Sequence, residues 1–116
     1  MDFFRVFLKE SIQASDKENL LQYSINPSMA NKIDPLPQQY LDSDPVPLVK
    51  LPQGVYFFTQ LRKEFIDGKE LLELAIELQK EALWNRLKPE NKLYLRKLYE
   101  DGSFVTQLWR PINGES

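Results

Sequence analysis

Four side chains near the C-terminal end have the chemistry to bind a flat ligand: two aromatic rings, a guanidinium and an amide. They lie on either side of Asp101-Gly102, and an Asp-Gly pair between two strand-like runs is typical of a two-residue hairpin turn. Such a turn fixes the register and places the four side chains on one face as two facing pairs. The pairs are Tyr94 with Trp109 and Arg96 with Gln107.

This patch has three interpretations. Rings beside a guanidinium and an amide can stack a planar ligand or a nucleobase and hydrogen-bond its edge. Trp, Tyr and Arg are also the residues that dominate protein–protein interfaces. The simplest interpretation is cross-strand packing of Tyr94 on Trp109, with Arg96 in solvent. We therefore predict Tyr94, Arg96, Gln107 and Trp109 as a candidate interface or ligand surface, with plain packing as the alternative.

The residue types argue against catalysis. The sequence contains no histidine and no cysteine, which removes thiolate nucleophiles, imidazole bases and the usual zinc ligands. No serine lies in a G-x-S-x-G or S-x-x-K motif, and the four glycines are too scattered for a phosphate-binding loop. We predict that the protein is not an enzyme and has no catalytic, cofactor-binding or metal-ligating residues.

One stripe of carboxylates needs a separate interpretation. Glu70, Glu73, Glu77 and Glu81 are spaced so that they share one face of a predicted helix. Converging carboxylates can perform acid–base chemistry or bind Mg²⁺ and Ca²⁺. On a helix whose other face is rich in leucine, such a stripe is more typical of a solvated surface, and this is the interpretation that the pattern favours.

The N-terminal residues predict a pair of helices. Apolar side chains recur at spacings of three and four over residues 2–13, which is the pattern of an amphipathic helix. Ser15 and Glu18 then form a capping box, and a second short helix is expected to run from there to about Ser24.

The rest of the chain predicts a connector and a compact α+β unit. Five of the eight prolines fall within residues 35–52, so an extended connector is expected there. After it come a predicted strand, a helix opened by an acidic cap at Asp67, and the hairpin. Their expected ranges are 54–59, 68–87, 92–100 and 103–110.

Together these elements predict one α+β domain spanning residues 1–116. It consists of an N-terminal helical pair, a proline-rich connector and a C-terminal β-α-β-β unit with a three-stranded, mainly antiparallel sheet packed on one long helix. Its expected parts are residues 1–30, 31–52 and 53–112, with a frayed tail at 113–116. Both faces of the predicted hairpin carry large apolar side chains, so we expect the N-terminal helices or a second subunit to cover the second face.

Charge and hydropathy narrow the choice of partners. Fifteen basic and 17 acidic residues give a net charge of −2, which makes nucleic acid an unlikely partner although residues 86–110 lean basic. No apolar run is long enough to span a membrane. We predict a non-catalytic cytoplasmic protein that acts through a protein–protein surface, as a homodimer or with another protein. The alternatives are a small-molecule binding domain that uses the aromatic patch and a weak RNA- or single-stranded-DNA-binding module.

Overall fold

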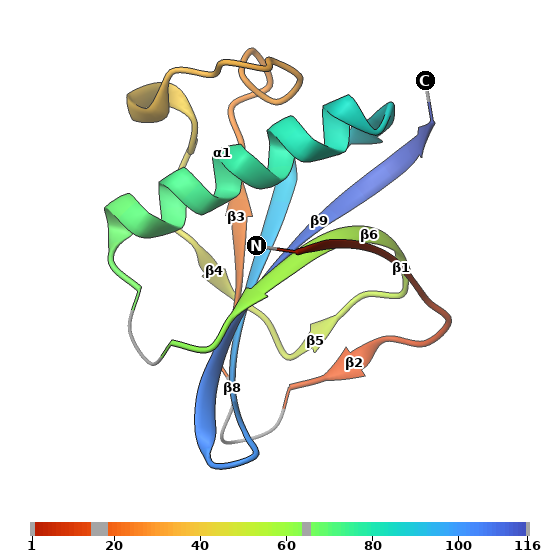
Figure 1. Ribbon diagram of the computed structural model, residues 1–116, viewed down its shortest axis with the longest axis vertical. Helices are drawn as coiled ribbons and strands as arrows, with labels where there is room; N and C mark the ends of the chain where they lie inside the picture. Colours follow the sequence, from red (N-terminus) through yellow and green to blue (C-terminus); the bar gives the residue numbers. More distant parts are fainter. Residues whose placement is uncertain (1, 15–18, 64–65, 116) are drawn as a thin grey trace.

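The computed structural model describes residues 2–14, 19–63 and 66–115 and shows one helix lying across one face of an antiparallel sheet (Figure 1). The sheet has seven strands in the order β1-β6-β9-β8-β3-β4, with β7 paired to β9. Its strands are β1 (Phe3–Leu8), β3 (Asn19–Ser24), β4 (Val46–Pro47), β6 (Gly54–Leu61), β7 (Leu87–Pro89), β8 (Lys92–Glu100) and β9 (Ser103–Glu115). The other elements are the helix α1 (Gly68–Trp84), the 3₁₀ helix η1 (Pro37–Gln39) and a ribbon of β2 (Ile12–Gln13) with β5 (Lys50–Leu51).

The predicted N-terminal helical pair is wrong, and so is the three-stranded sheet. Residues 3–8 form β1, which pairs with β6, and residues 19–24 form β3, which pairs with β8. Phenylalanine and valine dominate β1, and such residues favour a pleated surface over a helix once a partner strand is available. That partner is more than 40 residues away in the chain, so local spacing alone could not reveal the pairing that makes this segment a strand. The capping box at 15–18 lies outside the described residues.

The C-terminal predictions hold better because their signals are local. The hairpin register is confirmed, with Tyr94 opposite Trp109 and Arg96 opposite Gln107. Asp101 and Gly102 both have positive φ angles, 50° and 77°, as a type I′ turn requires. The helix is also confirmed at Gly68–Trp84, and the side chain of Asp67 caps it by accepting a hydrogen bond from the Glu70 amide. β9 continues to Glu115, so residues 113–115 of the expected frayed tail lie in a strand.

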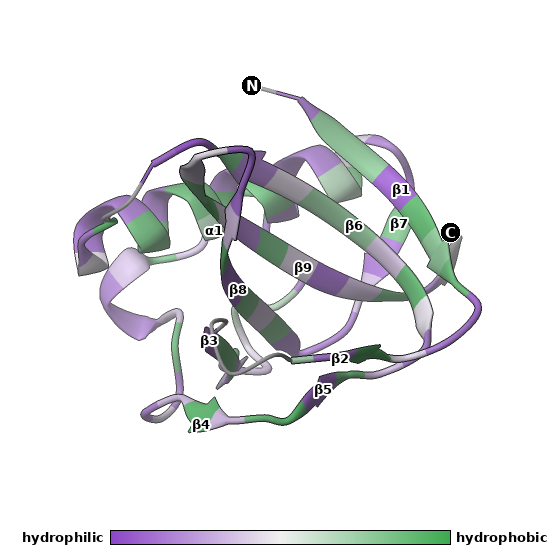
Figure 2. Cartoon of the chain, turned by 90° about the horizontal axis from the view of Figure 1, so that it is seen from below, coloured by the Kyte–Doolittle hydropathy of each residue, from purple (hydrophilic) through white to green (hydrophobic). Residues whose placement is uncertain are grey.

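The two faces of the sheet are covered by different segments. The leucine face of α1 packs on the first face, where Leu78 and Leu108 are fully buried. The second face is covered by the β2–β5 ribbon and its flanks, which contribute Leu51 (fully buried), Ile12 and Leu48 (Figure 2). The cover that we expected from N-terminal helices therefore comes from strands of the N-terminal segment and the proline-rich connector. Within the described residues, no helix is long and apolar enough to cross a membrane.

The two ends of the sheet differ in how their edges are protected. At one end, the connector runs along the outer side of β3: the Leu48 amide donates to the Leu20 carbonyl and the Asp42 amide to the Ser24 carbonyl. The last strand on that side, β4, has two residues and includes Pro47, which cannot donate to a further strand. At the other end, β1 has six residues and, in the part of the chain that the structure describes, pairs only with β6.

Candidate functional site

The predicted patch is assembled as expected, but most of it is enclosed. Tyr94, Gln107 and Trp109 are buried beside the β2–β5 ribbon, whereas Arg96 is half-buried. The Trp109 ring stacks on Phe58 with ring centroids 4.4 Å apart. The patch is thus continuous with the aromatic cluster that forms the second core of the protein.

Its polar groups hydrogen-bond to one another. The Gln107 Oε1 atom accepts from Trp109 Nε1 at 3.0 Å and from the Arg96 guanidinium at 3.3 Å, and Gln107 Nε2 donates to Gln60 Oε1 at 3.0 Å. The groups that would recognise the edge of a planar ligand therefore already have partners within the chain. The role of this patch in binding stays a prediction.

Tyr94 also lines a small pocket on the sheet, with a volume of about 290 Å³. Tyr56, Glu90 and Lys92 lie around the same space. Burial raises the pKa of Tyr56 and of Tyr94, and the nearby Glu90 carboxylate raises both further. Both phenols are therefore neutral at physiological pH, and the Tyr56 hydroxyl already donates to the Pro52 carbonyl at 2.6 Å.

Buried tyrosines make the stability of the fold depend on pH in the alkaline range. Burial is the largest cause of a raised pKa at Tyr23, Tyr40, Tyr56 and Tyr94. Their pKa is higher in the folded than in the unfolded chain, so the folded state binds more protons above the unfolded value of about 10. We expect full stability below that pH and a progressive loss above it. In a Tyr99→Phe variant, whose remaining tyrosines are these four, phenolate absorbance and circular dichroism should change together during an alkaline titration. Ionisation of the four phenols in a fully folded protein would contradict this.

A second network surrounds Arg110, which is fully buried. Its Nε donates to the Glu90 carbonyl at 2.6 Å, one terminal nitrogen donates to the Tyr40 hydroxyl and Gln79 Oε1 at 2.9 Å, and the other donates to the Ala30 carbonyl at 3.0 Å. These acceptors are all neutral groups. Burial lowers the pKa of Arg110, although Tyr40 and Glu90 partly offset this.

This network joins three parts of the fold. Gln79 lies on α1 and donates to the carbonyls of Met29 and Lys32, while the Tyr40 hydroxyl donates to its side-chain oxygen. The segment of residues 25–41 is thereby attached to the helix and to β9. Because the network is enclosed, we assign it to stability.

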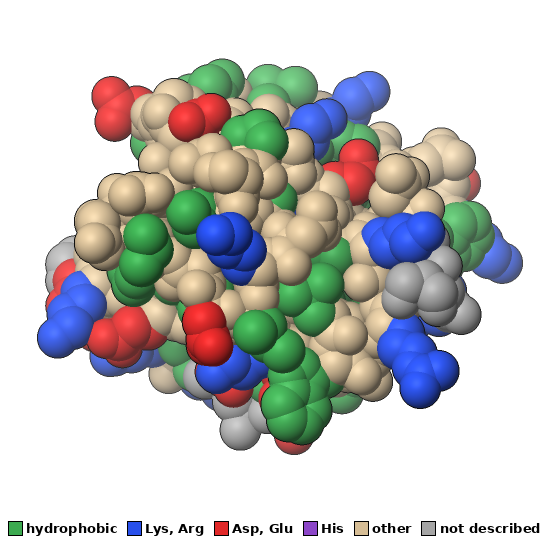
Figure 3. All heavy atoms as spheres, turned by 90° about the horizontal axis from the view of Figure 1, so that it is seen from above, with side chains coloured by type: hydrophobic (Ala, Val, Ile, Leu, Met, Phe, Trp, Pro, Cys, Tyr) green, Lys and Arg blue, Asp and Glu red, His purple; other side chains and the backbone are tan. Residues whose placement is uncertain are grey.

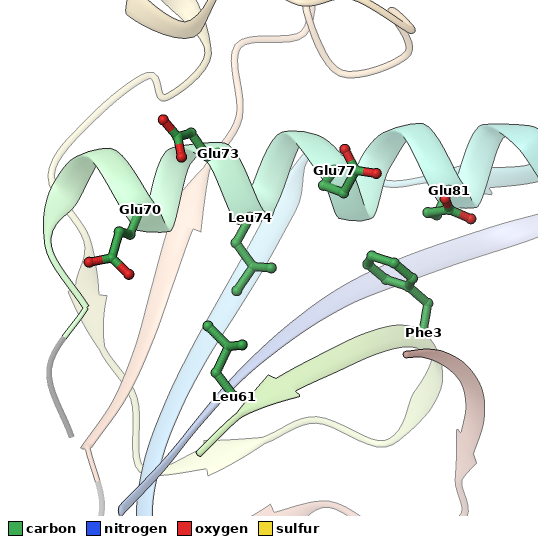
Figure 4. A pocket seen from close by; sticks show the side chains of 7 residues that line it. All are labelled: Phe3, Leu61, Glu70, Glu73, Leu74, Glu77 and Glu81. Carbon is green, nitrogen blue, oxygen red and sulfur yellow. The ribbon is translucent and has the colours of Figure 1, made fainter. Parts of the chain in front are cut away.

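A groove lies between α1 and the strands β1 and β6, with a volume of about 430 Å³ (Figure 4). Leu74 and Phe3 approach from opposite sides of it, and Leu61 lies below Leu74. Its remaining lining is the carboxylate stripe of α1, so the stripe borders a groove with an apolar floor. The lining residues are Phe3, Leu61, Glu70, Glu73, Leu74, Glu77 and Glu81.

The charge of this groove has one sign. Its four charged lining residues are glutamates, whereas basic and acidic side chains are intermixed on the face seen from above α1 (Figure 3). Glu70 pairs with Lys63, but Glu73, Glu77 and Glu81 have no ion pair within the described residues. In residues 2–14, 19–63 and 66–115, no three acidic side chains are close enough together to hold a metal ion.

β1 borders the groove and carries exposed aromatic side chains. Phe3 packs on Phe57 on the helix side of the sheet, with ring centroids 6.0 Å apart. Phe4 is 47% exposed and Phe7 is 60% exposed. An edge strand leaves a row of backbone N–H and C=O groups without partners. The β1 edge, defined by Phe3–Leu8, is therefore the outer side of a strand that has no second partner strand among the described residues, and it lies next to an acidic groove.

This surface was not predicted from the sequence, because the apolar spacing over residues 2–13 indicated a helix. The aromatic and β-branched composition of β1 was the signal that could have indicated a strand. No known family, curated protein or solved structure matches the chain. The functional interpretation therefore depends on the surfaces described above.

Proposed function

We propose that the protein is a non-catalytic binding module that recognises another protein by accepting an extended segment along the β1 edge. The observation that carries this proposal is the six-residue, mostly apolar strand at one end of the sheet, whose outer side has no partner strand among the described residues. Natural proteins usually shorten such an edge, charge it or cover it, as the connector does beside β3. We place this activity in the cytoplasm, which the absence of cysteine supports.

Strand addition suits both faces of β1. In this mode, main-chain hydrogen bonds supply affinity and pockets for alternate side chains supply specificity. On the ribbon side, Phe4 contacts Phe58, and Val6 packs against the second core. On the helix side, Phe3 lies at the groove. An added strand would therefore find apolar surface for its side chains on both faces.

A pair of proline substitutions tests this mode. Consecutive residues of a strand direct their amides to opposite edges. Of the two variants Arg5→Pro and Val6→Pro, one therefore removes an amide that points away from β6. The other removes a hydrogen bond between β1 and β6. The variant whose melting temperature is closer to that of the wild type identifies the free-edge substitution. We expect it to weaken, by about tenfold or more, the binding of peptides selected on the wild type from a displayed random library.

Tyr99→Ser is the matched control, because it removes an exposed aromatic side chain from the hairpin tip, away from β1. Selected peptides should bind this variant as they bind the wild type. Peptides that bind the free-edge proline variant with unchanged affinity would contradict the proposal, and so would a library that yields no binder.

A further inference from the structure

We infer that the segment accepted by the β1 edge belongs to a partner protein and alternates apolar with basic side chains. This inference rests on the proposed function and adds the chemistry of the partner. Three observations support it: the position of the groove beside β1, the nature of its floor, and the sign of its charge.

The position of the groove decides which side chains of an added strand reach it. A strand paired with β1 would lie about 4.8 Å beyond it, and every second side chain would point to the helix side. From there, a short side chain would contact the helix-side residues of β1, which are Phe3, Arg5 and Phe7, and of these Phe3 lines the groove. A long chain such as lysine or arginine can lay its methylene groups on the apolar ring and extend its charged end further.

The charges of the groove match such side chains. Beyond Phe3, as Figure 4 shows, Glu77 and Glu81 extend from the side of α1 above the ring. These glutamates and Glu73 have no ion pair within the described part of the chain. Cationic ends reaching over Phe3 would supply the counter-charges, while the apolar side chains of the segment would continue the ribbon-side surface at Phe4 and Val6.

A second copy of this chain fits the groove less well. Antiparallel pairing of two β1 strands about a two-fold axis would bring in Arg5 and Lys9, but it would also bring another four groove glutamates on the same side of the joined sheet. The shared surface would then remain acidic. The net charge of −2 also gives no overall attraction between copies.

Two synthetic peptides test the inference on the full chain. Each has about eight residues, enough to span β1; one alternates valine with lysine and the other alternates valine with glutamate. We expect the lysine peptide to bind, with an affinity that falls as salt rises, and the glutamate peptide not to bind. Fluorescence anisotropy measures both.

Variants of the groove test whether its glutamates bind the lysine side chains of the peptide. The double variant Glu77→Gln, Glu81→Gln keeps helix-forming side chains. It should weaken the binding of the lysine peptide by up to about fivefold for each lysine–glutamate ion pair that is lost. Glu100→Gln at the exposed hairpin end is the matched control and should change nothing. The free-edge proline variant should abolish binding of the same peptide, which connects the groove to strand addition.

The possible outcomes separate the two proposals. If both peptides bind equally and both lose binding in the free-edge proline variant, the β1 edge accepts strands but the basic partner is overturned. If neither peptide binds, the basic partner is again overturned, while the display selection tests strand addition independently. A wild-type dimer in analytical ultracentrifugation that becomes monomeric in the free-edge proline variant would identify a second copy as the occupant and overturn the inference.

Discussion

Replacing Arg110 with methionine is expected to lower the free energy of unfolding by about 3–5 kcal/mol, because it leaves buried carbonyl acceptors without a donor. Methionine fills a similar space but has no donor for the four acceptors around the guanidinium. Those acceptors are the carbonyls of Ala30 and Glu90, the Tyr40 hydroxyl and the Gln79 amide oxygen. Gln79 Oε1 keeps the hydrogen bond from the Tyr40 hydroxyl, whereas the Ala30 and Glu90 carbonyls lose their donor. A buried acceptor that loses its donor costs about 1–3 kcal/mol, so two such losses still destabilise the fold strongly.

Urea denaturation followed by circular dichroism measures the change in the free energy of unfolding. In a separate thermal melt, the melting temperature should fall by roughly 10–25 °C. Arg62→Met is the matched control, because Arg62 is exposed, and it should change stability by less than about 0.5 kcal/mol. Hydrogen exchange should increase first in residues 25–41, which the network attaches to α1 and β9. A loss below about 1 kcal/mol for Arg110→Met would show that the network is not a major source of stability.

Replacing Trp109 with alanine is also expected to lower the free energy of unfolding strongly, by about 3–5 kcal/mol. Trp109 is 4% exposed, stacks on Phe58 and meets the Tyr56 ring edge-on with centroids 5.6 Å apart. Truncation would leave a cavity between the sheet and the β2–β5 ribbon. It would also remove the indole donor from Gln107.

Trp84→Ala provides the control, because this second tryptophan is 72% exposed at the end of α1. It should change stability by less than about 0.5 kcal/mol. Far-ultraviolet circular dichroism follows the unfolding of both variants in guanidinium chloride, because the tryptophan left in Trp109→Ala is already exposed in the folded protein. Equal stability of the two variants would contradict the packing described for Trp109. Binding studies of the aromatic patch are better served by Arg96→Ala, because loss of binding in Trp109→Ala would also reflect unfolding.

The parts of the fold that could be predicted from the sequence are those whose signals lie within a few residues. Asp101-Gly102 specifies the turn of the hairpin, and the turn then fixes which residues of β8 and β9 face each other. Asp67 and the leucine spacing after it specify α1 in the same local way. The proximity of the four patch residues followed from that register alone.

The surfaces used in the proposed function depend on distant pairings, which local spacing does not contain. Phe3 and Leu74 meet only because β1 pairs with β6, and β1 carries a residue pattern compatible with either a helix or a strand. The burial of Trp109 likewise depends on Leu51, which belongs to the connector. Proline indicated correctly that the connector has no long helix, but it gave no information about which face of the sheet the connector covers.

The unequal protection of the two sheet edges also limits the stoichiometry of assembly. Of the two ends of the main sheet in the described residues, one is closed by the connector and ends at Pro47, so the β1 end is the one with a row of backbone groups ready to pair. A molecule with two open edges can add copies at both ends and grow into a fibre. A molecule with one open edge forms a complex that is complete after a single pairing event. Strand addition at β1, as proposed, would therefore give a finite one-to-one complex and not a polymer.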